Sequence, residues 1–293
     1  MLASFDFDQA EGLRRMLAGP KPRIVTFLSA TPEDDKGAML VNLGASLAQS
    51  GNDVMIVDAC TRDYGVAQRL GVDRGPSLLQ VARQECALNQ VIHSVPQGFA
   101  VTTLARTPCA SGDDARRLAK TFDVLVKQAG SIIMVDGEFS ADGSFPVPIM
   151  ASSEIVVQVS TSATSITNAY ALIKRLSQHL GRRPFGILVT GATEAEAKVV
   201  YDNMSSAATR YLAVTLTSMG SVPADEYLHR AARLGRAVVD AFPLAGASVA
   251  FRRLAGASRA RACSRAGPLD AALTNESLEP CTRSKGKRTR TFC

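Results

Sequence analysis

Short β-branched segments alternate with longer amphipathic segments along most of this chain, and this alternation restricts the fold more than any other feature. The segments that we expect to be strands span residues 23–29, 53–58, 99–104, 131–136, 155–160, 185–190 and 214–219. The spacing of apolar residues predicts helices over residues 7–17, 37–49, 113–128, 164–180, 194–211, 224–234 and 248–255. Strands that alternate with helices of this length form βαβ units. The sequence therefore predicts an α/β fold with a doubly wound, mostly parallel sheet flanked by helices.

The composition fits one large domain of this class. Of the 293 residues, 46% are hydrophobic and 20% are charged. No apolar run approaches the ~18–20 residues that cross a bilayer, and the first eight residues lack the basic and apolar regions of a secretory signal. The six cysteines include no CxxC pair, so we expect reduced thiols and no metal site. These features predict a soluble cytoplasmic protein.

Positive charge is concentrated at the carboxyl end. The chain has a formal net charge of +6, and residues 256–293 contain eight Lys or Arg and three acidic residues. Such a tail can bind nucleic acid or an anionic membrane surface, or it can be a solvated, unstructured end. We expect a basic, disordered tail over residues 257–293. We do not expect a nucleic-acid partner, because the rest of the chain has no basic surface interleaved with aromatic residues.

Candidate site residues follow the predicted strands, at the sheet edge where doubly wound folds bind ligands. The first strand is followed by a seven-residue loop that ends in Lys36 and leads into a helix. A strand, a loop with a late lysine and a helix form the layout of a phosphate-binding loop. Asp58 and Asp136 end two other strands, where such enzymes hold water-orienting and magnesium-associated carboxylates. A strand-terminal Asp can also be a helix cap, so the pattern indicates a nucleotide site without establishing it.

Four stretches of the sequence carry a more specific pattern. They are Asp8-Gln9-Ala10-Glu11-Gly12-Leu13-Arg14, residues 36–59, the run that begins Ser165-Ile166-Thr167-Asn168-Ala169-Tyr170, and residues 223–243. In this order and spacing, the chain resembles the MinD/ParA class of P-loop ATPases, and within it the FlhG/FleN regulators of flagellar number and placement. The resemblance covers about residues 6–255 and implies a MinD-like P-loop NTPase fold.

The resemblance also implies partners. In this family the N-terminal helix docks on the signal-recognition-type GTPase of flagellar placement and stimulates its hydrolysis. The residues of this chain that match that helix are Asp8, Gln9, Ala10, Leu13 and Arg14. Flagellar switch proteins and transcription regulators are further candidate partners. The alternative is that the apolar side of this helix packs on the sheet, and one helix can do both.

A shorter pattern lies near the end of the predicted domain. Nucleotide-driven dimerisation in this family exposes or orders a membrane-binding carboxyl-terminal helix. Here Phe251 and Leu254 are three residues apart, hence on one helix face, and Arg252 and Arg253 lie between them. A helix of this kind can lie on the inner face of a membrane as a peripheral contact. The alternative is a final helix that packs on the core.

The phosphate loop departs from the pattern of the family. Where the family has GKGGVGKT, this chain has Ala30-Thr31-Pro32-Glu33-Asp34-Asp35-Lys36-Gly37. Glycines let such a loop turn several N–H groups toward phosphate, whereas Pro has no N–H. Each acidic side chain opposes a phosphate by roughly 4 kcal/mol at ~4 Å and an effective dielectric of ~20. The loop is therefore poorly suited to a triphosphate.

Other family groups are replaced as well. The replacements are Thr31 for the signature lysine, Gly37 for the magnesium-binding Ser or Thr, Cys60 for the second Asp of the DAD motif, and Thr190 for the adenine-binding Asn. What remains is a vestigial nucleotide site of Lys36, Gly37, Asp58 and Asp136. We expect no catalytic residue and no firmly bound cofactor, although ATP and Mg²⁺ are the candidates if the site still binds.

These observations predict a regulator of flagellar number, placement or biosynthesis that acts through protein contacts and does not hydrolyse ATP. The alternative is a functional MinD-like ATPase that switches between a monomer and a membrane-associated dimer. A third interpretation, a MinD-like protein of polysaccharide secretion, is opposed by the N-terminal match. We expect three parts: residues 1–20 as an N-terminal helix and linker, residues 21–256 as a MinD-like α/β domain, and residues 257–293 as the tail.

Overall fold

The computed structural model describes residues 22–60, 65–107, 112–140 and 142–265, with only the backbone for residues 258–265. The chain divides into two compact units, residues 1–256 and 257–293. The expected N-terminal helix at 7–17 lies outside the described residues. The account below therefore concerns the first unit and the helix that ends it.

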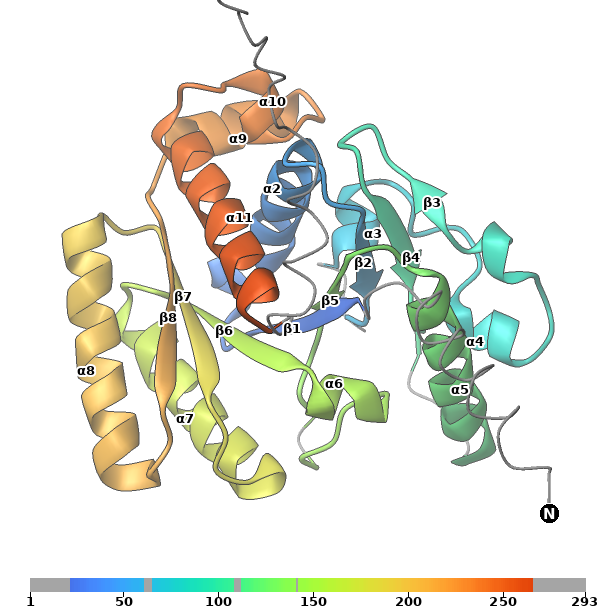
Figure 1. Cartoon of the computed structure of the whole chain (residues 1–293), viewed down its shortest axis with the longest axis horizontal. Helices are drawn as coiled ribbons and strands as arrows, with labels where there is room; N and C mark the ends of the chain where they lie inside the picture. The colour runs from blue at the N-terminus through green and yellow to red at the C-terminus, as the bar shows by residue number, and fades with distance from the viewer. Residues whose placement is uncertain (1–21, 61–64, 108–111, 141, 266–293) are drawn as a thin grey trace, which may run out of the picture. The chain divides into compact units, whose positions relative to one another are not determined.

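A mostly parallel sheet lies at the centre of the first unit (Figure 1). Its strands are β1 (Arg23–Ser29), β2 (Val54–Asp58), β3 (His93–Ser94), β4 (Ala100–Thr103), β5 (Ile132–Asp136), β6 (Glu154–Ser160), β7 (Phe185–Thr190) and β8 (Leu216–Val222), in the order β3-β4-β2-β5-β1-β6-β7-β8. Every neighbouring pair is parallel except β3 and β4. The predicted doubly wound fold is confirmed, and β1 lies in the middle of the sheet between β5 and β6.

Helices cover both faces of this sheet. They are α2 (Lys36–Gln49), α3 (Val66–Arg69), α4 (Leu78–Ala82), α5 (Gly112–Gln128), α6 (Pro148–Ser152), α7 (Ala163–Leu180), α8 (Glu194–Leu212), α9 (Glu226–Arg233), α10 (Val238–Ala241) and α11 (Gly246–Arg265), with the 3-10 turns η1 (Pro32–Asp34) and η2 (Leu88–Gln90). Alternate side chains of each strand point to opposite faces. Accordingly, Met134 of β5 packs in the core beneath α2 and α11, whereas Ile133 and Val135 pack beneath α5.

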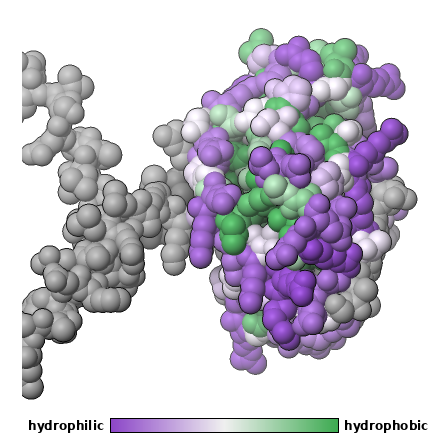
Figure 2. All heavy atoms as spheres, turned by 90° about the vertical axis from the view of Figure 1, so that its right-hand side faces the viewer, coloured by the Kyte–Doolittle hydropathy of each residue, from purple (hydrophilic) through white to green (hydrophobic). Residues whose placement is uncertain are grey.

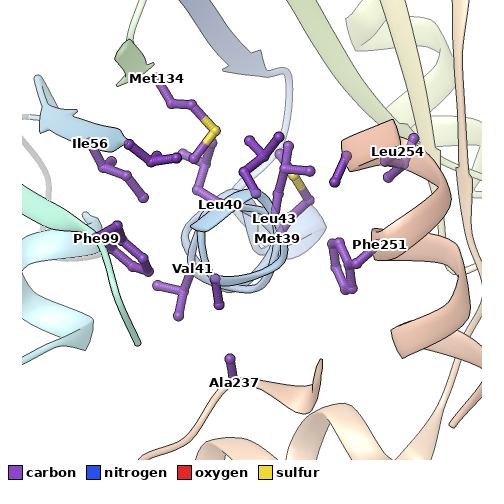
Figure 3. Close-up of a cluster of buried hydrophobic side chains, with 14 of the residues drawn as sticks. Met39, Leu40, Val41, Leu43, Ile56, Phe99, Met134, Ala237, Phe251 and Leu254 are labelled. Carbon is purple, nitrogen blue, oxygen red and sulfur yellow. The ribbon is translucent and has the colours of Figure 1, made fainter. Parts of the chain in front are cut away.

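Helix α2 is buried around almost its whole circumference. Figure 3 looks along α2 and shows Ile56, Phe99 and Met134 on one side and Phe251 and Leu254 of α11 on the other. A Cβ atom at Gly44 would lie within 3.0–3.3 Å of Ile56, Met134 and Phe99, so glycine permits the close approach of α2 to the sheet. The phosphate-loop region thus precedes one of the most firmly packed helices of the chain.

The packing of α11 distinguishes the two interpretations of residues 251–254, a membrane-facing stripe and a helix that packs on the core. Phe251 and Leu254 are 1% and 7% exposed and belong to the core around α2. Arg252 donates to the carbonyl of Pro243 at 2.5 Å, and Arg253 is ion-paired with Glu194. In this structure the packing alternative holds for the two apolar side chains, because they are enclosed by α2. The prediction that they form a membrane-facing stripe is wrong for this conformation.

Several elements differ from the sequence-based expectations. The short helices α3, α4, α6 and α10 and the strand β3 were not predicted, because five residues or fewer carry no readable periodicity. Strand β8 begins and ends later than residues 214–219, with a register irregularity opposite Ile187 and Leu188. Helix α11 extends to Arg265, well beyond the expected residue 255, so the prediction of disorder is wrong for residues 257–265, which continue the helix. At the carboxyl edge of the sheet, the later end of β8 places Val222 in that edge, whereas the ends of β1, β2 and β5 lie at the predicted residues.

Candidate functional site

A large groove runs along the carboxyl edge of the sheet. It has a volume of about 1490 Å³ and is lined by the loops after β1, β5 and β8 and by α7 and α9. Lys36, Gly37 and Asp136 line it, and Asp58 lies beside Asp136 because the two residues are partners in the β2–β5 register. The structure therefore brings the four residues of the predicted nucleotide site together.

The loop that precedes α2 is a tight turn. The N–H groups of Asp34 and Asp35 donate to the carbonyls of Thr31 and Pro32 at 3.4 and 3.2 Å. Asp35 adopts a left-handed conformation, with φ +46°, and its carboxylate accepts a hydrogen bond from the N–H of Ala38 at 3.1 Å. Asp35 thus caps α2, and these three N–H groups bond within the chain.

Asp34 is the buried acidic residue of this loop. Its Oδ2 accepts hydrogen bonds from the hydroxyls of Ser165 at 2.8 Å and Ser29 at 3.2 Å. Its carbonyl accepts a hydrogen bond from Nε2 of Gln158. The loop is consequently tied to β1, to β6 and to the start of α7.

The side chain of Lys36 lies against the sheet edge. Its ammonium group is 2.7 Å from Oδ1 of Asp136 and also donates to the carbonyls of Gly137 and, at 3.4 Å, Phe27. The side chain of Lys36 is only 11% exposed. The ammonium group thus donates two hydrogen bonds to carbonyl oxygens and forms an ion pair with Asp136.

Asp58 and Asp136 hold the start of α3. The two oxygens of Asp58 accept hydrogen bonds from the N–H groups of Cys60 at 3.0 Å and Ala67 at 2.7 Å. Oδ2 of Asp136 accepts one from the N–H of Val66 at 3.1 Å. Burial, with the neighbouring charge of Asp136, raises the pKa of Asp58 to about 6 despite these bonds and nearby Lys36.

Helix α3 is also connected to the loop before α2. Arg69, its last residue, forms an ion pair with Asp35 at 2.5 Å. Its N-cap, Gly65, leaves no room for a side chain, because a Cβ atom there would lie 2.3 Å from Oδ2 of Asp58. Charged side chains of the loop, of α3 and of the ends of β2 and β5 are therefore connected. We call this set the loop clasp, and it comprises Asp34, Asp35, Lys36, Asp58, Arg69 and Asp136.

The replaced family positions have ordinary structural contacts. Thr31 is buried, and its carbonyl accepts a hydrogen bond from the hydroxyl of Ser29 at 2.7 Å. The thiol of Cys60 donates to Glu138 at 3.2 Å. Thr190 lies in the groove wall, and its hydroxyl accepts from Nε2 of Gln158 at 3.2 Å. Gly37 is buried in the first turn of α2.

Four residues of this region were not predicted from the sequence. They are Ser29, Arg69, Gln158 and Ser165. Ser165 belongs to a motif that was recognised, but its bond to Asp34 depends on tertiary placement. The predicted partner-binding residues Asp8, Gln9, Ala10, Leu13 and Arg14 lie outside the described residues.

Other surfaces of the described chain offer no comparable site. The side that carries α4 and α5 is mostly hydrophilic, with some apolar side chains near its middle (Figure 2). The most exposed large apolar side chains are spread over several elements and comprise Val124, Val199, Tyr211, Leu234, Leu244 and Val249. In the described ranges, three or more His, Cys, Asp or Glu side chains do not meet in a metal-binding arrangement. Nor does any described helix combine the length and apolar character needed to cross a membrane.

Comparison with known proteins finds a relative by sequence and similar folds among solved structures. The sequence is 32% identical over 227 residues to the antiactivator FleN of Pseudomonas aeruginosa, covering 73% of this chain and 78% of FleN. No family model matches the sequence. The fold resembles MinD of Pyrococcus horikoshii, solved with Mg-ADP, with TM-score 0.60, 16% identity, and coverage of 87% of this chain and 99% of MinD. It also resembles a ParA family ATPase from Chlorobium tepidum, with TM-score 0.56, 15% identity, and coverage of 80% and 97%.

Proposed function

Because the chain belongs to the family of the antiactivator FleN and has a MinD-like fold, we propose that it regulates flagellar number, placement or biosynthesis through protein contacts and does not hydrolyse ATP. It acts in the cytoplasm in this proposal. The observation that carries the absence of hydrolysis is the loop before α2, in which the carboxylate of Asp35 already accepts from the N–H of Ala38 and the carboxylate of Asp34 is buried against Ser165.

The described loop fits a triphosphate poorly. A helix N-terminus attracts phosphate because its first N–H groups are unpaired, but here the carboxylate of Asp35 already accepts from the N–H of Ala38. Pro32 contributes no N–H, and Glu33 is an exposed negative charge at the same turn. Bound phosphate would have to displace one carboxylate and approach another.

The lysine is also engaged elsewhere. A phosphate-loop lysine must reach the β- and γ-phosphates, whereas Lys36 is paired with Asp136 at 2.7 Å. Reaching a nucleotide would leave the buried Asp136 carboxylate without its cation, which is costly. Gly37 supplies no hydroxyl for Mg²⁺. These contacts support a site in which Lys36 pairs with a carboxylate of the protein and not with a bound nucleotide.

Equilibrium binding of a fluorescent ATP analogue with Mg²⁺ tests this proposal. We expect no saturable binding by the full chain up to millimolar nucleotide, and the same for a truncation after residue 256. The matched variants are Lys36→Ala and Lys198→Ala, since Lys198 is an exposed lysine on α8 paired with Asp202. Micromolar binding that is lost in Lys36→Ala and kept in Lys198→Ala would overturn the proposal.

The second candidate function is a MinD-like ATPase that switches between a monomer and a membrane-associated dimer. It is favoured by the meeting of Lys36, Asp58 and Asp136 at the carboxyl edge and by the Mg-ADP bound to the Pyrococcus MinD. ATP and Mg²⁺ would then be its cofactors. The contacts of Lys36 and Asp35 are the reason that we place it second.

The proposed output is the N-terminal segment that contains Asp8, Gln9, Ala10, Leu13 and Arg14. It would bind the signal-recognition-type GTPase of flagellar placement, and a transcription regulator is the partner that an antiactivator requires. We expect Gln9→Ala with Arg14→Ala to abolish stimulation of the GTPase without lowering the melting temperature of the chain. Stimulation that survives while the melting temperature falls would assign this segment to packing instead.

A further inference from the structure

The loop clasp contains more negative than positive charge. Among the described residues, the groove lining includes the carboxylates of Glu33, Asp34, Asp35, Asp136, Glu138, Asp225 and Glu226 and the basic side chains of Lys36, Arg69, Arg175 and Arg236. Lys36 is ion-paired with Asp136, and Arg69 is ion-paired with Asp35. The described lining therefore carries more carboxylates than Lys and Arg side chains, and Glu33 and Asp34 are the two acidic residues of the loop before α2 that lie outside these two ion pairs.

Part of this negative charge is buried. Asp34 is 8% exposed, and its hydrogen-bond donors are two neutral hydroxyls. Within the described ranges, no Lys, Arg or His lies at ion-pair distance from its carboxylate. Asp58, directly behind Asp136, is likewise buried and held by two backbone N–H groups. Hydroxyl and amide dipoles reduce the cost of a buried carboxylate, but only a cation cancels its charge.

A buried acceptor without a partner lies at the same place. Gln158 is fully buried and belongs to the groove wall. Its Nε2 donates to the carbonyl of Asp34 and to Thr190, whereas its Oε1 has no hydrogen-bond partner among the described residues. Buried acceptors are nearly always satisfied. An occupant that carries hydrogen-bond donors as well as positive charge would satisfy this acceptor once the groove wall shifts to expose it, because Oε1 has almost no accessible surface in this structure.

We propose that this end of the groove, around Glu33, Asp34 and Gln158, binds an arginine side chain of a partner protein. A guanidinium carries a permanent positive charge and five N–H donors in a planar fork that matches carboxylates. A bare divalent ion is disfavoured, since the described side chains do not gather into a set of metal ligands. The proposal rests on the proposed function, because it requires the site to be free of nucleotide.

The size and lining of the groove indicate a peptide segment and not a free small cation. Its volume of about 1490 Å³ exceeds that of a typical small-molecule pocket. Phe139, Leu172 and Leu228 add apolar surface along its walls. An arginine flanked by apolar residues would place its charge at the loop clasp and its neighbours on these side chains.

Fluorescence anisotropy with labelled hexa-arginine, compared with hexa-citrulline, tests the inference on the full chain. Citrulline keeps the shape of arginine but lacks its charge. We expect hexa-arginine to bind about tenfold more tightly, since charge-assisted hydrogen bonds are the stronger kind. We expect Glu33→Gln and Asp34→Asn each to weaken binding several-fold. The matched control is Glu85→Gln, the same change of charge on an exposed residue outside the groove.

The outcomes separate this inference from the proposed function. Equal binding of both peptides, or equal weakening by Glu85→Gln, would overturn the arginine site, and so would saturation of the site by millimolar Mg²⁺ alone. If neither hexa-arginine nor Mg-ATP binds, the inference fails and the proposed function stands. If Mg-ATP displaces bound hexa-arginine, the site is not free of nucleotide, and both the proposed function and the arginine site that rests on it fail.

Discussion

The two ends of the same helix contrast sharply. The body of α2 is enclosed by apolar side chains from the sheet and from α11 (Figure 3), whereas its first turn is held by the charged contacts of the loop clasp. Apolar burial is non-directional and tolerates many residues of similar size. Buried charges depend on each partner being present. The core therefore maintains the fold, and the loop clasp determines what the site can bind.

The largest effect is expected in the core. Phe251→Ala removes a fully buried ring that packs near α2, and we expect it to lower the free energy of unfolding by about 3–5 kcal/mol. Urea denaturation measures this change. Leu244→Ala is the control, because that side chain is 93% exposed and should shift the value by less than ~0.5 kcal/mol. Unchanged stability of Phe251→Ala with lost vesicle binding would restore the membrane interpretation.

The next effect tests whether the loop clasp behaves as a set of partners. Lys36→Met leaves the buried carboxylate of Asp136 without its cation, and we expect a loss of roughly 3 kcal/mol of stability. Adding Asp136→Asn should recover most of that loss, because both charges are then gone. A double-mutant cycle in urea gives the coupling energy. A coupling near zero would show that the pair is not a structural contact in solution.

This contrast also explains what the sequence could predict. The seven long strands and the body of α2 follow from runs of β-branched residues and from apolar spacing, so their bounds agree with the structure within a few residues. The strand pattern correctly predicted that Lys36, Asp58 and Asp136 lie together, because parallel strands place their carboxyl ends at one edge of the sheet. The pairing of Lys36 with Asp136 was not predicted, because no sequence pattern indicates the direction in which a single side chain points.

The remaining contacts of the loop clasp depend on distant parts of the chain. Ser165 and Gln158 reach Asp34 across more than a hundred residues, and no local pattern identifies them. The burial of Phe251 could not be predicted from the sequence either, because the spacing of Phe251 and Leu254 fits a core helix as well as a membrane-surface helix. Tertiary packing decided between the two.

A smaller effect is expected from pH. The pKa of Asp58 is about 6 in the folded chain and 3.8 in its ordinary state, so the folded state binds the proton more tightly. Protonation of Asp58 therefore favours folding, and this contribution is present below pH 3.8 and lost as the pH rises through 6. The shift corresponds to roughly 2–3 kcal/mol.

Urea denaturation at pH 4.5 and pH 7.5 isolates the contribution of Asp58 when wild type is compared with Asp58→Asn. Groups distant from Asp58 contribute equally to both proteins, so the difference between the two pH dependences reports Asp58 together with its neighbour Asp136. We expect the variant to lose stability less steeply with rising pH than wild type. Parallel pH profiles would show that Asp58 is more hydrated in solution than its enclosure by α3 implies.

The smallest effect concerns the exposed edge of the loop clasp. The ion pair of Arg69 with Asp35 is partly exposed, so Arg69→Ala should cost less than ~1 kcal/mol of global stability. Its local effect should be greater, because the pair joins α3 to the loop before α2. We expect faster amide hydrogen exchange in residues 30–38 and unchanged exchange in the body of α2. Arg233→Ala, an exposed arginine on α9, is the matched control. Equal amide exchange of residues 30–38 in both variants would mean that the contacts of Asp34 and Lys36 are enough to order the loop. Arg69 would then not belong to the loop clasp.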